Sequence, residues 1–164
     1  MSPYVSIIIV THNAAADLER CFHALPGAAG DLPFEVIVAD AQSTDRTVEI
    51  ARASALSPIL LEIENCGFAA AANRGATRAT GEFLLFLNPD AVLPPYSLPR
   101  LISLCRHERV AAVSGLLVND KGIPEPFGER FPSLGWYLRR RLPNARAPLP
   151  PAPCPLPGAP FSIP

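Results

Sequence analysis

The sequence predicts an α/β fold built on a mainly parallel sheet that helices cover on both faces. Short, nearly continuous apolar segments recur across residues 4–93, and segments with helical spacing of apolar side chains separate them. Continuous apolar strands that alternate with helices are typical of parallel sheets buried on both faces. With 164 residues, 49% hydrophobic and 18% charged, the chain can bury one hydrophobic core.

The first repeat covers residues 4–25. Tyr4–Val10 is rich in Ile and Val and predicts a strand, which ends in the polar group Thr11-His12-Asn13. In Ala14–Leu25 the apolar side chains recur at the spacing of one helix face, so this segment predicts a helix. Those side chains are Leu18, Cys21, Phe22 and Leu25.

The second repeat has the same order. Phe34–Ala39 predicts a strand, and Asp40–Asp45 predicts a polar loop after it. A helix is predicted next, and Ser43 or Thr44 is suited to cap its first turn. That helix carries Val48, Ile50 and Ala51.

Two further strands complete the pattern. Ile59–Ile63 is the third predicted strand, and the alanine-rich Phe68–Thr80 has strong helix propensity. The stretch Gly81–Leu93 contains a fourth strand that runs into Asn88-Pro89-Asp90, a polar breaker with one carboxylate. In parallel sheets, ligands bind beyond the carboxyl ends of the strands. We therefore expect the polar clusters that follow these strands to meet on one side of the sheet.

Beyond Leu93 the pattern weakens. Leu98–Cys105 predicts a short helix, and Val110–Val118 predicts a fifth strand that leads into a turn at 119–122. Proline is frequent across residues 143–164. Because proline interrupts helices and central strands, we expect those residues to be extended or poorly ordered.

Composition argues against several classes of protein. The formal net charge of -1 gives no general electrostatic attraction to nucleic acid. The N-terminal segment lacks the cationic start of a signal peptide, and no apolar run has the length of a membrane span, so we expect a cytoplasmic protein. The cysteines show neither a C-x-x-C pair nor zinc-ligand spacing, which favours free thiols without a metal or redox role. They are Cys21, Cys66, Cys105 and Cys154.

The common nucleotide-binding loops are also missing, since neither G-x-x-x-x-G-K-[ST] nor G-x-G-x-x-G occurs. Asp40 follows the second strand as phosphoryl-accepting aspartates do, but Gln42 stands where an aspartyl phosphatase has a second Asp. A receiver domain would have an acidic cluster after its first strand, where this chain has Thr11-His12-Asn13, so a receiver-like signalling domain is a weaker alternative. His12 has no partner at metal-ligand spacing, and isolated histidines are more often structural than catalytic.

Four segments of the chain resemble the family 2 glycosyltransferases with the GT-A fold, and in particular their rhamnosyltransferase-like branch. The resemblance covers about residues 2–132, with motifs in the family's order. The segments are VSIIIVTHN at 5–13, VIVADAQSTDRT at 36–47, NCGFAAAANRGATRATGEFLLFLNPDAVL at 65–93 and AVSGLLVNDKG at 112–122. It implies transfer of a sugar from a nucleotide-diphosphate donor, linked to UDP, dTDP or GDP, to a saccharide or glycolipid hydroxyl, with inversion.

The resemblance also implies a donor site at the carboxyl edge of the sheet. Thr11, His12, Asn13 and Asp40 match the positions that hold the base, and a carboxylate there can accept from a base N–H. Ser43 and Asp45 match the same motif. For those two, support of the ligand and a role at the start of the next helix are equally good interpretations, with Ser43 as a cap and Asp45 complementing the helix dipole.

A second motif of the family follows the third strand. Gly67 allows close backbone approach to the nucleotide, and Asn73 offers both a donor and an acceptor. Gly75 completes that motif, and we expect core packing for Phe68 and ligand contact for Asn73.

Asn88-Pro89-Asp90 matches the family's metal motif. The resemblance implies that Asp90 ligates Mg2+ or Mn2+, with Asn88 on the donor side. A divalent cation offsets the negative charge that develops on a diphosphate leaving group. A turn after a strand is the alternative explanation of this tripeptide.

The chain departs from the family at several places. Ala41 and Arg46 stand where the family usually has Asn and Gly. The family's catalytic Asp or Glu lies in an acceptor-binding half, yet no acid follows Arg130, and none of the last acids matches that base. Those acids are Asp120, Glu125 and Glu129. We therefore expect a truncated donor-binding part, a non-catalytic nucleotide-sugar-binding subunit, or a chain that another polypeptide complements.

Two domain-level expectations follow. Residues 1–132 form a partial GT-A domain, and 133–164 form an Arg-rich and then Pro-rich tail. Trp136–Leu138 followed by Arg139–Arg141 is suited to peripheral contact with the inner membrane face, although a solvated helix end is the simpler interpretation. A role in polysaccharide biosynthesis is implied by the resemblance alone.

Overall fold

The computed structural model describes residues 3–119 and 122–124. The chain forms two compact units, Met1–Val113 and Ser114–Pro164. The first unit contains all of the helices and strands that are described below. Of the second unit, the structure describes residues 114–119 and 122–124.

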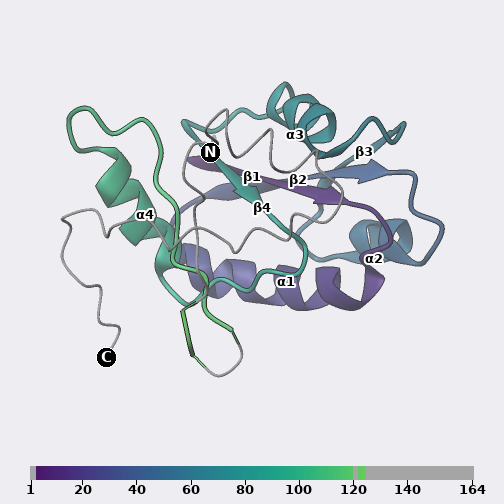
Figure 1. The fold of residues 1–164 in the computed structure, drawn as a ribbon, viewed down its shortest axis with the longest axis horizontal. Helices are drawn as coiled ribbons and strands as arrows, with labels where there is room; N and C mark the ends of the chain where they lie inside the picture. The colour runs from purple at the N-terminus through teal and green to yellow at the C-terminus, as the bar shows by residue number, and fades with distance from the viewer. Residues whose placement is uncertain (1–2, 120–121, 125–164) are drawn as a thin grey trace, which may run out of the picture. The chain divides into compact units, whose positions relative to one another are not determined.

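Four parallel strands form one sheet in the first unit. They are β1 (Val5–Thr11), β2 (Phe34–Ala41), β3 (Ile59–Ile63) and β4 (Phe83–Leu87). Their order across the sheet is β3-β2-β1-β4, so β1 and β2 are the central strands (Figure 1). The register places Thr11 beside Asp40, so both residues lie at the carboxyl edge.

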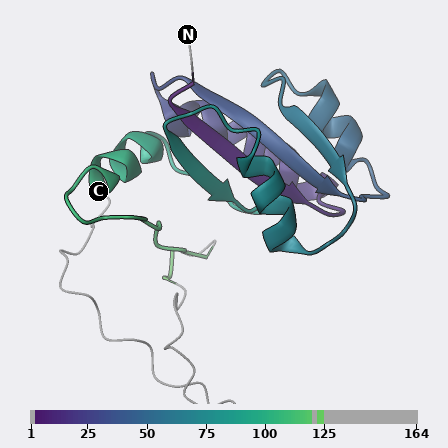
Figure 2. The ribbon, with the colours of Figure 1, turned by 90° about the horizontal axis from the view of Figure 1, so that it is seen from above.

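Helices pack against both faces of this sheet. They are α1 (Ala15–Ala29), α2 (Thr47–Ala53), α3 (Phe68–Ala76) and α4 (Ser97–Cys105). Side chains of α1, α2 and α4 join the main hydrophobic core with Ile7, Ile9 and Val38. Figures 1 and 2 show α3 on the opposite face of the sheet from α1. The two-sided covering confirms the predicted α/β fold.

Close approach of α3 to the sheet depends on Gly75. A Cβ placed on this glycine would lie 2.5 Å from Cγ2 of Ile8, a β1 side chain that is 1% exposed. Real Cβ atoms do not approach a carbon so closely, so only glycine lets the helix pack at this depth. Gly75 therefore has a packing role that its place in a motif does not reveal.

The structure confirms the predicted strands and helices of residues 4–105, with shifts at their ends. β3 has the predicted bounds, whereas β1 extends to Thr11 and β2 to Ala41, both of which the sequence placed in loops. α3 ends at Ala76 and not at Thr80. Parallel pairing carries β1 and β2 one or two residues beyond their apolar runs, because Thr11 and Asp40 pair in register.

The predicted fifth strand is wrong. Residues 110–117 form no strand, and only Val118 makes an isolated bridge, to Pro124. Leu116 and Leu117 are 65% and 48% exposed, so this apolar run gains little burial. An apolar run forms a strand only where a neighbour accepts its backbone hydrogen bonds, and the described part of the chain offers this one no ladder.

The second unit retains the predicted turn. Gly122 N–H donates to Asn119 O at 2.8 Å, and Asn119 N–H donates to Ile123 O at 3.0 Å. The other features predicted beyond Asn119 lie outside the described residues: Asp120, Glu125, Glu129, the Trp136–Arg141 segment and the Pro-rich 143–164. The domain boundary at 132 stays a prediction.

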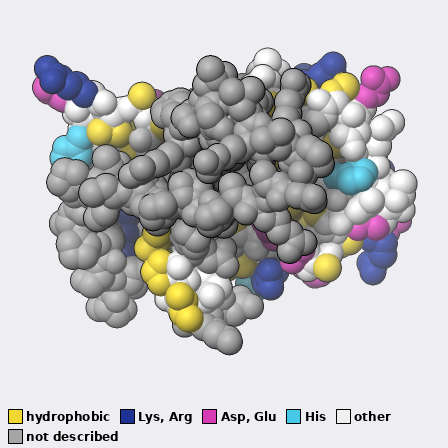
Figure 3. Space-filling view, viewed as in Figure 1, with side chains coloured by type: hydrophobic (Ala, Val, Ile, Leu, Met, Phe, Trp, Pro, Cys, Tyr) yellow, Lys and Arg dark blue, Asp and Glu magenta, His cyan; other side chains and the backbone are white. Residues whose placement is uncertain are grey.

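Among the described residues, no helix is long and apolar enough to span a bilayer. Figure 3 shows one face of the molecule on which the visible Arg and acidic side chains lie interspersed.

Candidate functional site

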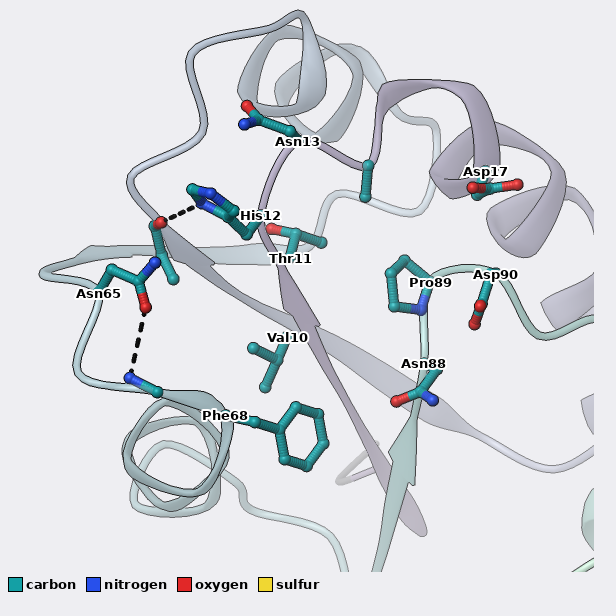
Figure 4. A pocket seen from close by; sticks show the side chains of 13 residues that line it. Val10, Thr11, His12, Asn13, Asp17, Asn65, Phe68, Asn88, Pro89 and Asp90 are labelled. Carbon is teal, nitrogen blue, oxygen red and sulfur yellow. Dashed lines mark hydrogen bonds between the residues drawn. The ribbon is translucent and has the colours of Figure 1, made fainter. Parts of the chain in front are cut away.

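A cavity of about 390 Å3 opens at the carboxyl edge of the sheet. Its wall comes from the segments that follow β1, β3 and β4, as parallel strand ends require. Figure 4 shows His12 and Asn13 on one side and Asn88, Pro89 and Asp90 on another. Six of the predicted site residues line it: Thr11, His12, Asn13, Gly67, Asn88 and Asp90.

Asp40 lies at the end of β2 with 2% of its surface exposed. Its Oδ1 accepts from Thr11 Oγ1 at 2.7 Å and from Ser43 Oγ at 2.5 Å, and its Oδ2 accepts from Ser43 N–H at 2.9 Å. A carboxylate has about four acceptor positions, so Oδ2 retains one for a ligand N–H. Asp40 does not line the larger cavity; it lines a second cavity, of about 290 Å3, together with Ser43, Gln42 and Glu64.

His12 is oriented by the neighbouring strand. Its Nδ1 lies 2.7 Å from the backbone oxygen of Ala41. Because a carbonyl oxygen only accepts, Nδ1 carries the proton in this contact, and the Nε2 of a neutral ring is left as an acceptor. His12 therefore presents an acceptor at the cavity wall.

Asn13 connects the segment after β1 with the segment after β2. Its backbone N–H donates to Ser43 Oγ at 2.8 Å, and its Oδ1 accepts from Thr44 N–H at 2.8 Å. The φ angle of Asn13 is +53°, in the left-handed region that few residues other than glycine adopt. These two bonds hold Asn13 in that conformation. Ser43 and Thr44 thus act between loops, and the predicted capping of α2 by either of them is wrong, because its N-cap is Arg46 without a side-chain bond.

Asp45 lines neither cavity. Its Oδ1 accepts from the N–H of Thr47 at 3.0 Å and from that residue's hydroxyl, and its Oδ2 accepts from Ala15 N–H at 3.1 Å. The side-chain bond from Thr47, together with the backbone N–H bonds, lowers the pKa of Asp45 below its ordinary value. Asp45 therefore bonds to the first residue of both α1 and α2.

Asp90 is exposed at the cavity, and its backbone oxygen lies 3.5 Å from Nη2 of Arg20. Arg20 also contacts Asp17 Oδ1 at 3.2 Å. Nearby, burial and then the charge of Asp90 raise the pKa of the Cys21 thiol to about 11. Asp90 is therefore the acidic group at the carboxyl end of β4.

The sequence made two predictions for α3, the helix that follows β3, and the structure overturns the first and leaves the second open. Phe68 is 54% exposed and lines the cavity, so the prediction that it packs in the core is wrong. As the first residue of α3 it lies beyond the part of the helix that covers the sheet. Asn73 is exposed and lines neither cavity, and its ligand contact stays a prediction. Gly67 has φ +87°, which explains glycine at that position.

Sequence reasoning missed Asp17, which lines the same cavity as Asp90. The signal was available, because Asp17 lies in the first turn of the helix that follows the first strand. Asn65, which belongs to the polar group that the sequence places after the third strand, lines the cavity too. Its backbone N–H donates to Gln42 Oε1 at 3.3 Å.

The donor set suits a divalent cation only in combination with a substrate. Among the described residues, no group of three or more His, Cys, Asp or Glu side chains could hold a metal ion. Mg2+ is commonly held by one or two carboxylates together with substrate phosphates and water. Asp90, exposed at the cavity, fits the protein's share of such a site.

Parallel α/β sheets bind ligands at their carboxyl edge, and here that edge holds a polar cavity, with Asp40 at the end of β2 and Asp90 after β4. The family model for glycosyl transferase family 2 matches residues 6–154, and the chain belongs to that family. The fold agrees with solved GT-A structures.

Two solved structures illustrate the likeness. A mannosyltransferase from Pyrobaculum calidifontis, in complex with GDP-Man and Mn2+, is 29% identical with a TM-score of 0.59, over 66% of this chain and 34% of that protein. TarS 1-349 from S. aureus, in complex with UDP-GlcNAc, is 28% identical with a TM-score of 0.53, over 64% of this chain and 31% of that protein.

Curated relatives give the same family. A dolichol-phosphate mannosyltransferase of Pyrococcus furiosus is 30% identical over 142 residues, which are 84% of this chain and 40% of that protein. Glycosyltransferase AglE of Haloferax volcanii is 34% identical over 118 residues, or 69% of this chain and 39% of that protein. The chain thus spans about two fifths of the length of these relatives. Membership of the family removes the receiver-like alternative.

Proposed function

We propose that this chain forms the nucleotide-sugar-binding part of a glycosyltransferase that moves a sugar from a nucleotide-diphosphate donor to an acceptor hydroxyl. One observation carries the proposal: the cavity at the carboxyl edge brings His12 and Asn13 opposite Asn88 and Asp90. Asp40, with one acceptor position left on Oδ2, supports a base at the β2 end of this edge.

A divalent cation is the second part of the proposal. Asp90 would hold Mg2+ or Mn2+ at the cavity, and Asn88 beside it can donate to or accept from the donor's polar groups. When bound, the cation supplies positive charge that stabilises a leaving diphosphate. The structure of the Pyrobaculum relative holds Mn2+ and GDP-Man together, which supports this assignment by likeness.

The acceptor and the stereochemistry belong to the proposal as well. The name of one relative, a dolichol-phosphate mannosyltransferase, supports an acceptor linked to a lipid phosphate, and a saccharide acceptor rests on the resemblance alone. Inversion requires a carboxylate that removes the proton of the acceptor hydroxyl. Asp17 and Asp90 are the acids that line the described cavity, and we assign the base to neither. Membership of the rhamnosyltransferase-like branch, a cytoplasmic or peripheral membrane location, a role in polysaccharide biosynthesis and a complementing polypeptide stay predictions.

The second candidate function is non-catalytic binding of a nucleotide sugar. It is favoured by the lining of the described cavity, whose acids, Asp17 and Asp90, include none that we assign as the base. Both candidates require the donor site, and only the first requires turnover.

Calorimetric titration of the full chain with UDP, dTDP and GDP, each with and without Mn2+, tests the donor site. We expect one nucleotide to bind with Mn2+ and to lose most of its affinity in Asp90→Ala. Asp31→Ala, which removes an exposed carboxylate just after α1, is the matched control and should bind as the wild type does. Equal binding by wild type and Asp90→Ala would contradict the metal assignment. A folded chain that binds none of the three nucleotides would contradict the proposed function.

A further inference from the structure

Five consecutive residues at the carboxyl end of β1 are each hydrogen-bonded to the segment 40–47. Residues 11–15 are called the wall segment, because four of them line the larger cavity. The bonds are Thr11 Oγ1 to Asp40 Oδ1, His12 Nδ1 to Ala41 O, Asn13 N–H to Ser43 Oγ, Ala14 N–H to Thr47 Oγ1 and Ala15 N–H to Asp45 Oδ2. Their lengths lie between 2.7 and 3.1 Å.

The start of α1 has no cap of its own. Its N-cap residue is Ala14, whose side chain cannot accept a hydrogen bond. Helix N-termini leave backbone N–H groups without partners inside the helix. Here Thr47 Oγ1 accepts from Ala14 at 2.8 Å and Asp45 Oδ2 accepts from Ala15 at 3.1 Å. The caps of α1 therefore come from a segment about thirty residues away along the chain.

Asp45 is the residue that joins both helix starts. Its Oδ1 accepts from the N–H and hydroxyl of Thr47, and the same hydroxyl oxygen accepts from Ala14. A negative charge at this place also complements the dipole of the 15-residue α1. The pKa of Asp45 is lowered mainly by the side-chain bond from Thr47, in agreement with a carboxylate that accepts three hydrogen bonds.

The anchored backbone carries the groups that face the cavity. His12 and Asn13 lie directly before Ala14, and Asn13 has a left-handed φ of +53°, a conformation that Asn adopts more readily than most residues other than glycine. If the start of α1 were released, the wall segment would lose two of its five attachments, at Ala14 and Ala15. His12 and Asn13 would then move relative to the β4 side of the cavity.

We propose that Asp45 is a positioning residue, which fixes the wall segment of the nucleotide cavity through the start of α1 and does not contact the nucleotide itself. The proposal rests on the function proposed above. It replaces the ligand interpretation of Asp45 with a role carried by its hydrogen bonds to Ala15 and Thr47. Asp45 lines neither cavity, in keeping with action through its neighbours.

The first test compares nucleotide affinity in Asp45→Ala, Asp45→Asn and the control Asp31→Ala, with the nucleotide that the wild type binds best in Mn2+. Loss of two or three hydrogen bonds to a carboxylate predicts that Asp45→Ala weakens binding about tenfold. Asp45→Asn keeps one side-chain oxygen and should recover part of this loss. Asp31→Ala should bind as the wild type does. Titrations at 15 °C, with folding confirmed by circular dichroism, separate affinity from global stability.

A double-mutant cycle with His12→Ala separates positioning from direct contact. If Asp45 acts by placing the wall segment, its loss should cost less once His12 is gone, about threefold in place of tenfold. If Asp45 touched the nucleotide independently, the full tenfold loss would persist in both backgrounds and would overturn the proposal.

Hydrogen exchange of the wall-segment amides is a readout that needs no nucleotide. Asp45→Ala should lose protection at the N–H of Ala15, which donates to Asp45 Oδ2, and lose less at the N–H of Ala14, which donates to Thr47 Oγ1. Asp31→Ala should leave both unchanged. Unchanged protection, or lost protection with unchanged affinity, would overturn the positioning role. If the wild type binds none of the nucleotides, the proposed function fails, and exchange at Ala14 and Ala15 alone decides whether Asp45 anchors the wall.

Discussion

Glu35 ties the amino-terminal edge of the sheet together, and its removal should destabilise the fold without changing nucleotide binding. Its Oε1 accepts from Ser6 Oγ at 2.6 Å and from the N–H and Oγ1 of Thr80 at 2.7 and 2.8 Å. Ser6 Oγ in turn accepts from Gly81 N–H at 2.9 Å. One carboxylate thereby joins β1, β2 and the segment that enters β4, at the edge opposite the cavity.

The loss of unfolding free energy expected for Glu35→Ala follows from these hydrogen bonds. Hydrogen bonds to a charged acceptor contribute about 1.5 to 3 kcal/mol each when buried, but Glu35 is only partly buried, so we expect about 1 to 2 kcal/mol in total for Glu35→Ala. For a chain of this length, that loss lowers the Tm by about 3 to 8 °C. Glu35→Gln, which keeps one side-chain oxygen as an acceptor, should lose about half as much.

The pH dependence gives an independent check. Burial raises the pKa of Glu35, but the hydrogen bonds from Ser6, Thr80 and Gly81 outweigh it, and the net pKa lies below the ordinary value. A lowered folded-state pKa contributes stability that is fully present above the unfolded pKa, about 4.3 for Glu, and that is lost as the pH falls through the folded value. The stability gap between wild type and Glu35→Gln should therefore be largest near pH 7 and narrow toward pH 3.

Urea unfolding followed by circular dichroism between pH 3 and pH 7 measures this gap. Glu49→Ala, at an exposed carboxylate paired with Arg46, is the control and should change stability by less than about 0.5 kcal/mol. A Glu35→Gln gap that stays constant across this pH range would refute the assignment of the lowered pKa to these bonds. Loss of nucleotide affinity in Glu35→Ala would refute its separation from the site.

Three further outcomes are expected. Gly75→Ala should lower the unfolding free energy by about 1 to 3 kcal/mol through overpacking against Ile8. Gly27→Ala, with open space around it in α1, should be neutral or stabilising. Equal Tm values for the two variants would contradict the packing role of Gly75. Thr11→Val should destabilise the chain by about 1 kcal/mol by removing a buried bond to Asp40, measured by urea unfolding, and an unchanged midpoint would count against that bond. The Cys21 thiol, with its pKa of about 11, should react with iodoacetamide at pH 8 far more slowly than the exposed Cys66, as mass spectrometry of the modified peptides would show; comparable rates would be incompatible with burial of Cys21.

Much of the fold was predictable because its strands are apolar and its helices amphipathic. Ile59–Ile63 kept its predicted bounds, since polar and turn residues flank it on both sides. The prediction for Val110–Val118 failed because apolar content alone does not supply a hydrogen-bonding neighbour. Thr11 and Asp40 were assigned to loops because strand ends depend on the register between strands, which a single segment does not contain.

The sequence predicted the location of the candidate site, at the carboxyl edge of the sheet, better than the contacts of its individual residues. Six predicted residues line one cavity because parallel strands deliver their ends to the same side. Phe68 was misjudged because its apolar side chain suggested burial, while its position at the start of α3 leaves it at the cavity mouth. Asp17 was missed because its contact with the cavity depends on how α1 leaves β1.

Asp40 and Asp45 show why a motif alone does not assign roles to its members. Both are acids of one short segment, yet Asp40 is 2% exposed at a strand end and lines a cavity, while Asp45 lies outside both cavities and bonds to backbone N–H groups at two helix starts. What separates them is the direction of the chain, which turns away from the sheet after Ala41. The same turn lets Asp45 reach Ala15, so an acid that a sequence motif groups with the ligand is instead placed to hold the cavity wall.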